Sequence, residues 1–293
     1  MDFTSFLSYC LAGISVGSIY ALIAIGYTMV YGILRLINFA HGDVFMMSAY
    51  FMIFAMGVMP WYLSMIVVII ATIVLGVLIE KAAYKPLRTA PRMSIMISAI
   101  GVSYFLQNFA TYLFSALPKA YPSIPVLNKT IKFGEVSTSL VTFITPILTI
   151  IAVFILMFII KKTKVGMAMR AVSKDFETAQ LMGIKINDVI SITFVIGCFL
   201  AALGSILYFT PRPSVYPLVG SLPGLKCFIA AVFGGIGSIP GAVVGGFLIG
   251  LSETFIKAAG YSEFSDVFTF IILVIVLMFR PTGLFGEKMS EKV

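Results

Sequence analysis

Residues 161–189 read KKTKVGMAMRAVSKDFETAQLMGIKINDV and form the longest charged interval in a chain that otherwise consists mainly of apolar runs. This interval holds six of the twenty basic residues and three acidic ones. Apolar runs of about 20 residues, the length that crosses a membrane as a helix, flank it on both sides. We therefore interpret it as an aqueous loop between two spans, and its contacts as the main question about function.

The composition predicts a membrane protein. Hydrophobic residues make up 60% of the chain, charged residues 11%, and the mean hydropathy is +1.08, whereas about a quarter of an ordinary soluble domain is charged. Helices satisfy their own backbone hydrogen bonds in lipid, so the expected fold is an all-α, polytopic membrane helical bundle. The net charge of +8 lies mostly in loops, where membrane topology explains it better than a nucleic-acid partner does.

The apolar runs predict eight or nine membrane spans in a single membrane domain, residues 1–293. These runs lie at about 8–34, 44–59, 61–79, 93–116, 141–160, 190–210, 225–236, 240–260 and 265–279. The run at 44–59 is only sixteen residues long, so a re-entrant segment is the alternative to a full crossing there. Prolines exclude continuous helices in the polar segments 117–140 and 211–224.

The distribution of basic residues predicts the orientation. Loops 80–92 and 161–189 are separated by two spans, so they lie on the same side of the membrane. Together they carry half of the Lys and Arg residues. Basic residues collect on the cytoplasmic side, so we expect both loops to be cytoplasmic.

Within the charged loop, residues 173–182 are expected to form a short amphipathic helix. Gly183 can end such a helix in the left-handed conformation. Phe176 and Ala179, with Leu181–Met182, would offer an apolar surface, while charged residues such as Glu177 stay in water. Two interpretations remain open: the helix lies on lipid headgroups, or it docks into a groove of a cytoplasmic partner.

A polar break, RLINFAHGD at residues 35–43, separates the first two apolar runs. It contains Asn38, His41 and Asp43. One interpretation is a polar turn at the membrane edge. The other is a broken-helix gate, whose freed backbone groups would line the solute pathway, because irregular backbone at membrane depth needs protein or water around it.

Two adjacent amides, Gln107 and Asn108, lie inside a predicted span. Amides within the membrane must find partners in the bundle interior. Hydrogen bonds between helices are the first interpretation, and contact with a polar solute is the second.

Glycines at Gly237, Gly241 and Gly245 are spaced by four residues, with Gly246 and Gly250 offset by one. Small residues at this spacing let membrane helices approach closely. We expect close helix packing, and the alternative is that they line a solute route.

Three charged residues lie in the last apolar runs. Glu253 and Lys257 are four apart and can neutralise each other on one helix face. Lys226 either reaches the membrane surface or pairs with an acid elsewhere.

Missing motifs exclude several functions. The sequence contains no G-x-x-x-x-G-K-[ST] phosphate-binding loop. It has one histidine and three scattered cysteines, with neither a metal-like spacing nor paired carboxylates within the spans. We therefore expect no catalytic residue, metal site or bound cofactor, and no enzyme.

Several stretches resemble one known family. ETAQLMG (177–183) is similar to the E-A-A-x-x-x-G coupling helix of ABC importer permeases, with Thr178 in place of a small residue. GSIYALIAIGYTMVYGILRLINFAHGDVFMMSAY (17–50), SAIGVSYFLQN (98–108) and GLKCFIAAVFGGIGSIPGAVVGG (224–246) resemble LivH-type branched-chain amino acid permeases. The similarity runs from about residue 8 to Pro281-Thr282-Gly283.

This resemblance implies a permease subunit in the bacterial inner membrane, with Glu177, Thr178, Ala179 and Gly183 as the coupling residues. Its implied partners are a second related permease, two cytoplasmic ATPases that use ATP, and an extracytoplasmic binding protein that delivers leucine, isoleucine or valine. Related permeases carry urea, short amides or other amino acids, so these solutes stay open. An autonomous secondary transporter or channel is the alternative mechanism.

Overall fold

The computed structural model describes residues 3–35, 37–88, 90–133, 136–280 and 282–286. Leu36 in the polar break and Pro281 at the end of the recognised similarity lie outside the described residues. The described chain is a helical bundle with a few short strands, so the predicted all-α membrane fold is confirmed.

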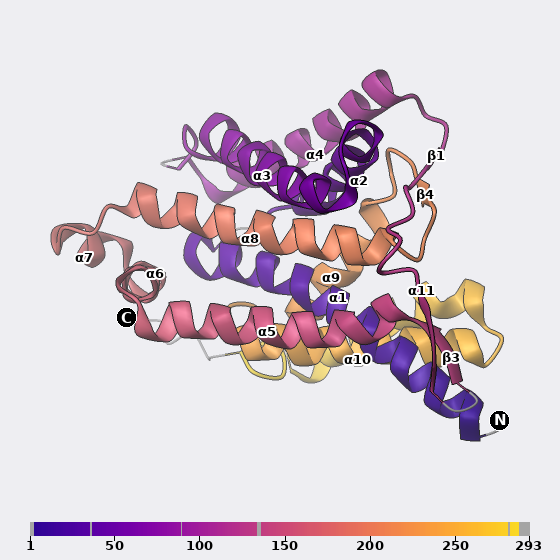
Figure 1. Ribbon diagram of the computed structural model, residues 1–293. Helices are drawn as coiled ribbons and strands as arrows, with labels where there is room; N and C mark the ends of the chain where they lie inside the picture. The colour runs from indigo at the N-terminus through magenta and orange to yellow at the C-terminus, as the bar shows by residue number, and fades with distance from the viewer. Residues whose placement is uncertain (1–2, 36, 89, 134–135, 281, 287–293) are drawn as a thin grey trace.

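Eight helices of the described chain are long and apolar enough to cross a membrane. They are α1 (Phe3–Leu34), α2 (His41–Val58), α3 (Trp61–Ile79), α4 (Arg92–Phe114), α5 (Leu140–Lys162), α8 (Ile186–Phe209), α10 (Ile239–Ala258) and α11 (Ser265–Phe279), which reaches 18 residues together with the short helix directly before it. Figure 1 shows α1 lying between α5 and α8 along the length of the bundle. Five shorter helices complete this part of the chain: η1 (Glu80–Tyr84), α6 (Lys164–Lys174), α7 (Phe176–Leu181), α9 (Ser221–Gly234) and η2 (Ser262–Phe264).

The two uncertain apolar runs have different outcomes. The run at 44–59 is α2, which begins at His41 and has 18 residues. The run at 225–236 lies in α9, which has 14 residues and is mostly buried by its neighbours. A helix that short does not cross the hydrocarbon core of a bilayer, so α9 is an internal helix rather than a ninth span.

Short strands join two of the polar segments at one end of the bundle. β1 (Lys119–Ala120) pairs antiparallel with β4 (Ser214–Val215), and β2 (Thr130–Phe133) pairs antiparallel with β3 (Val136–Ser139). The sequence did not predict these strands. The end that contains β1 and β4 is called the strand end.

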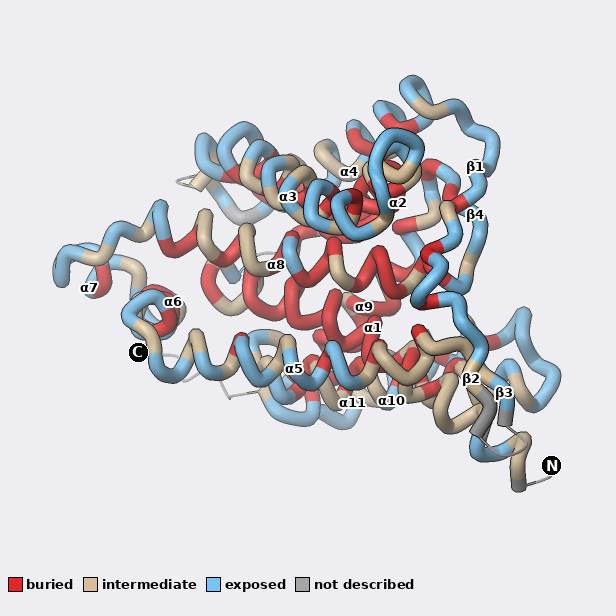
Figure 2. The backbone as a smooth tube through the Cα atoms, in the orientation of Figure 1, coloured by how far each residue is buried: buried red, intermediate tan, exposed pale blue. Residues whose placement is uncertain are grey.

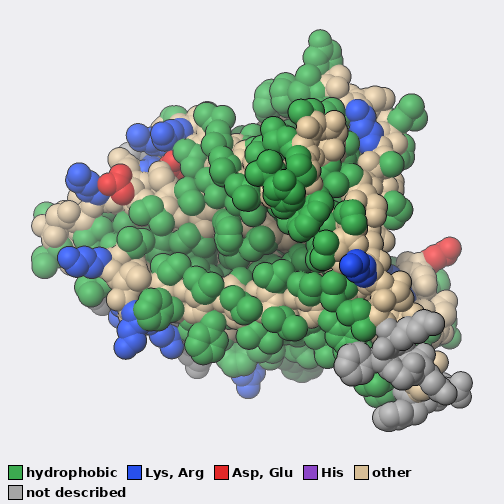
Figure 3. Space-filling view, in the orientation of Figure 1, with side chains coloured by type: hydrophobic (Ala, Val, Ile, Leu, Met, Phe, Trp, Pro, Cys, Tyr) green, Lys and Arg blue, Asp and Glu red, His purple; other side chains and the backbone are tan. Residues whose placement is uncertain are grey.

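The opposite end carries the two basic loops. Arg88, after η1, donates a hydrogen bond to Asn187 at the start of α8 and forms an ion pair with the buried Glu80. Loops 80–92 and 161–189 therefore meet at one end of the bundle. The end that contains η1, α6 and α7 is called the basic end, and Figure 3 shows Lys and Arg side chains gathered there.

The core follows α1, α8 and α9, which are buried along most of their length (Figure 2). In contrast, α5 and α11 present large apolar side chains outward: Phe154 is 77% exposed and Met278 is 75% exposed. A soluble protein rarely exposes so much contiguous apolar surface. These faces fit contact with lipid or with other membrane helices.

Glycines on α10 let two neighbouring helices approach it. Gly241 and Gly245 lie against the backbone of α9. Gly246 and Gly250 lie against α1, where a Cβ at Gly246 would come within 2.5 Å of Ala21 N. The predicted role in packing is therefore observed for four of the five glycines. Gly237 differs, because it precedes the helix with a φ of +96° and nothing lies within 4 Å of where its Cβ would be.

Candidate functional site

The first turns of α2 and α9 meet deep inside the bundle. A Cβ at Gly42 would lie 2.8 Å from Gly220 O and 3.1 Å from Gly224 Cα, so the close approach of the two helices requires glycine. His41 packs against Gly26, which lies about two turns before the end of α1. The polar break therefore turns back into the bundle, so that the first residue of α2 lies at the level of Gly26 rather than at the end of α1.

A cleft of about 370 Å³ opens beside these two first turns, within the size range of small-molecule sites. Four polar side chains without an aromatic ring line it: Asp43 of α2, Ser103 and Gln107 of α4, and Ser221 of α9. Its apolar wall includes Phe39, Ile100, Leu225 and Phe228. The cleft can thus hold a solute that has both a polar and an apolar part.

Gln107 connects the polar side chains of the cleft. Its Nε2 donates to Asp43 Oδ1 at 3.0 Å, and lies 3.3 Å from Ser103 Oγ and 3.5 Å from Ser221 Oγ. Asp43 is only 2% exposed. None of the ion pairs between described residues includes Asp43. The cleft therefore contains a buried carboxylate without a basic partner among those residues.

The other two polar residues of the break do not line the cleft. Asn38 is buried, and its side-chain oxygen accepts hydrogen bonds from Tyr84 Oη at 2.7 Å and Ala40 N at 3.1 Å. His41 is buried with its ring 4.7 Å from the ring of Tyr27. Both residues hold the non-helical connection in place, and of the three expected pathway residues in the break only Asp43 faces the cleft.

The structure also separates the two adjacent amides. Gln107 lines the cleft, whereas Asn108 is exposed, does not line the cleft and donates to Tyr104 O at 2.8 Å. Successive residues of an α-helix point about 100° apart, and here the two amides have different surroundings. The expectation that Asn108 points into the bundle is wrong for this chain.

Two of these four polar residues, Ser103 and Ser221, were missed in the sequence. Ser103 lies four residues before Gln107, which places the two on one helix face. Ser221 directly follows Gly220 at the start of an apolar helix. A search for polar residues four apart within a span would have found Ser103.

A buried charged cluster lies outside the cleft. The expected pair of Glu253 with Lys257 forms, and Lys226 pairs with Glu253 Oε1 at 3.0 Å and with Asp266 Oδ1 at 2.5 Å. Tyr20 Oη donates to Glu253 Oε2 at 2.7 Å. Lys226 thus pairs with acids on two helices, and the cluster joins α9 to α1, α10 and α11.

The charged loop folds into two helices instead of one. The predicted helix at 173–182 is interrupted at Asp175, which ends α6 and caps α7 by accepting hydrogen bonds from Glu177 N at 3.0 Å and Thr178 N at 3.1 Å. Thr178 Oγ1 also donates to Asp175 Oδ2 at 2.8 Å. As expected, Gly183 follows the helix with a left-handed φ of +81°.

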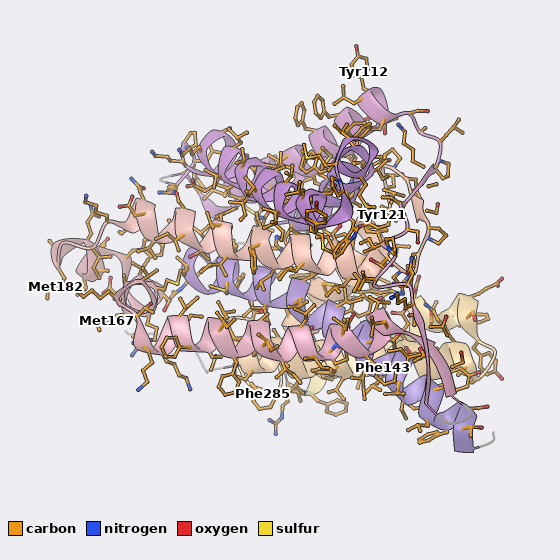
Figure 4. The ribbon with its side chains drawn as sticks, viewed as in Figure 1. Tyr112, Tyr121, Phe143, Met167, Met182 and Phe285 are labelled. Carbon is orange, nitrogen blue, oxygen red and sulfur yellow. The ribbon has the colours of Figure 1, made fainter. Side chains whose placement is uncertain are left out.

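The predicted apolar surface of this helix divides into two parts. Ala179 is buried and Phe176 is half-buried, because α7 packs on α6 and α8. Leu181 and Met182 point away from the chain and are 87% and 79% exposed. Figure 4 shows Met182 at the far tip of the basic end.

The helix α6 was not predicted, although its residues indicate it. Thr163 caps the first turn by accepting a hydrogen bond from Gly166 N at 3.1 Å. Gly166, Met169 and Val172 are three apart and form its buried face. Its last residues approach the polar break, where the Arg35 guanidinium lies 3.4 Å from Ser173 O. The α6–α7 segment therefore contacts the connection that leads into α2.

Comparison with known proteins gives consistent matches over almost the whole chain. Residues 9–277 match the family described as branched-chain amino acid transport system / permease component. The chain is 42% identical to the high-affinity branched-chain amino acid transport system permease protein BraD of Pseudomonas aeruginosa, over 98% of both chains. It is 40% identical to the corresponding LivH protein of Escherichia coli, over 100% of this chain and 99% of that protein. A probable branched-chain amino acid transport permease protein LivH of Methanocaldococcus jannaschii is 28% identical over 90% of this chain.

Proposed function

Because the chain belongs to the family of branched-chain amino acid transport permease components, we propose that it is the membrane-spanning subunit of an ATP-driven importer of branched-chain amino acids. It is a multi-pass membrane protein and not itself an enzyme. ATP is bound and hydrolysed on two separate cytoplasmic subunits, so this chain binds no cofactor. A second related permease completes the pathway, and an extracytoplasmic binding protein delivers the solute.

The observation that carries this proposal is the exposed tip of α7. Leu181 and Met182 are large apolar side chains that face water at the basic end. Figure 1 shows α7 lying beyond the end of α5, away from the spans. This position suits a helix that docks into the groove of a partner better than one that lies along the headgroups. An ATPase subunit is a partner of that kind.

The charges at the basic end support a cytoplasmic position for it. Both basic loops lie at this end, and basic residues collect on the cytoplasmic side of membrane proteins. The chain would then sit in the bacterial inner membrane with α7 facing the ATPases. The strand end would face the binding protein.

The predicted coupling residues have different roles in this proposal. Glu177 is exposed and can contact an ATPase together with Leu181 and Met182. Thr178 holds the cap of α7, and the buried Ala179 fixes α7 against α6 and α8. Gly183 ends the helix, so that the chain can turn back toward α8.

A mechanical route leads from this tip to the cleft. Closure of the ATPases moves α7, and α6 moves with it because the two helices pack together. The last turn of α6 contacts Arg35, which lies in the connection between α1 and α2. That connection ends at the first turn of α2, where Asp43 lines the cleft. Movement of α7 can thereby change the opening of the cleft.

Replacing Leu181 and Met182 by aspartate tests the proposal. ATP-driven leucine uptake is expected to fall by about tenfold or more, because exposed apolar anchors contribute most of the affinity at such interfaces. Folding should be unaffected, since both side chains lie in water. The measurements are uptake into proteoliposomes that contain the assembled importer, and co-purification of the ATPase subunits.

Met167→Asp is the matched control. Met167 is an exposed apolar residue at the same end, 62% accessible, but on α6 rather than α7. Uptake by this variant should stay close to wild type. Undiminished uptake with the doubly substituted α7 would contradict the proposal, and so would gradient-driven flux through this chain reconstituted alone.

A further inference from the structure

The acidic residues buried in the bundle fall into two kinds. Glu80 pairs with Arg88, and Glu253 pairs with Lys226 and Lys257. Asp43 is equally buried, but its described partners include the amide of Gln107 and no basic side chain. A buried carboxylate is costly unless it is paired with a positive charge. Asp43 therefore lacks a cationic partner among the described residues, and its side chain lines the cleft, where a cation could reach it.

Burial disfavours a negative charge on Asp43, but two features of its surroundings stabilise one. The residue lies in the first turn of α2, where the helix dipole stabilises negative charge. Gln107 Nε2 donates to it at 3.0 Å, and an amide donor supports a carboxylate without neutralising it. The cleft therefore offers a carboxyl group that two helices hold in place, and a cation bound beside it would supply the compensating positive charge.

We infer that the Asp43 carboxylate receives the ammonium group of the transported solute. An ammonium donates charge-assisted hydrogen bonds to a carboxylate and supplies the positive charge that the other two buried acids obtain from Lys or Arg. This inference rests on the proposed function, because it assigns the solute pathway to the cleft.

The apolar wall of the cleft favours a solute that carries an aliphatic side chain next to its ammonium group. Phe39, Leu225 and Phe228 also line the cleft, and an aliphatic side chain buried against them gains hydrophobic free energy. The exposed hydroxyl of Ser221, at the start of α9, can donate to a carboxylate that extends from the same carbon as the ammonium. The cleft thus selects solutes in which an ammonium group is close to an aliphatic chain.

Binding of three probes to the assembled importer without its binding protein tests this selection. The probes are leucine, 3-methylbutylammonium and 4-methylpentanoate, at millimolar concentration. They share a branched aliphatic chain, but the last has a carboxylate and no ammonium. Leucine and 3-methylbutylammonium should raise the melting temperature of the complex, and 4-methylpentanoate should not. An equal rise in melting temperature with 4-methylpentanoate would overturn the inference.

Substitutions then test the carboxylate itself. Asp43→Asn keeps the size of the side chain and an oxygen that accepts from Gln107, but removes the charge. Leucine uptake should fall by about tenfold or more. A hydrogen bond to a charged group contributes at least as much free energy as a tenfold change in affinity requires. Adding Gln107→Glu to that variant returns a carboxylate to the same place, and should restore a large part of the uptake.

Asn108→Asp in the Asp43→Asn background is the matched control. It adds a carboxylate to the next residue of α4, which is exposed and does not line the cleft, so it should restore nothing. Uptake by Asp43→Asn within about twofold of wild type, or equal rescue by both second substitutions, would overturn the inference. A wild-type importer that moves no branched-chain amino acid would instead contradict the proposed function, and the three probes would still decide what Asp43 binds.

Discussion

Replacing Glu253 by leucine is expected to lower the free energy of unfolding by about 3–5 kcal/mol, the usual cost of removing one partner from a buried ion pair. Glu253 is 3% exposed and is the centre of its cluster. It accepts from Tyr20 and pairs with both Lys226 and Lys257. Its loss would leave the Tyr20 hydroxyl without this acceptor, and Lys226 with Asp266 as its remaining acid in the cluster.

The measurement is equilibrium unfolding of the purified chain by SDS in mixed micelles. Glu263→Leu is the control, because Glu263 is an exposed acid in η2 and belongs to no ion pair among the described residues. That substitution should change stability little, since surface charges contribute about 0–1 kcal/mol.

A second substitution separates charge pairing from packing. Lys226→Met combined with Glu253→Leu removes both buried charges, so the double variant should lose less stability than the sum of the two single losses. Strict additivity of the two losses would show that the ion pair between them does not stabilise the bundle.

Replacing Gly250 by valine is expected to produce the second large effect. A Cβ at Gly250 would overlap the backbone of Gly17 on α1, and a helix backbone cannot move aside as a flexible side chain can. Overpacking of a core costs about 1–3 kcal/mol and occasionally more. We expect the upper part of that range, together with a lower yield of folded protein in the membrane.

Gly101→Val is the matched control for Gly250→Val. Gly101 lies in the middle of α4, and nothing lies within 4 Å of where its Cβ would be. Both substitutions change helix propensity equally, so the difference between their melting temperatures reports the contact between α10 and α1. Similar melting temperatures for both variants would contradict the role of Gly250 in this contact.

Local patterns in the sequence were sufficient for much of the bundle. Apolar runs predicted the spans, because a helix in lipid must be apolar over a fixed length. Gly183 predicted the end of α7, because few other residues adopt a left-handed φ. The spacing of Glu253 and Lys257 predicted their ion pair, because residues four apart are neighbours on a helix.

The candidate site was predicted only in part, because it depends on which way side chains point. Asp43 and Gln107 were both identified as polar residues in apolar surroundings. Asn38, His41 and Asn108 met the same criterion, and the structure places all three outside the cleft. The polarity of a side chain shows that it needs partners. The direction in which it points depends on how each helix is turned about its own axis when it packs against the others.

The sequence by itself determined that this chain is a helical membrane protein with a charged loop, since composition and run length decide whether a segment is stable in lipid. Only the tertiary structure decided that the loop divides at Asp175 and exposes Leu181 and Met182. It also decided that Lys226 pairs with Glu253 and Asp266, and that Asp43 meets Gln107 across 64 positions of the chain. The physical reason is that the depth and rotation of each helix are set by contacts such as those at Gly42 and Gly250, between residues far apart in sequence.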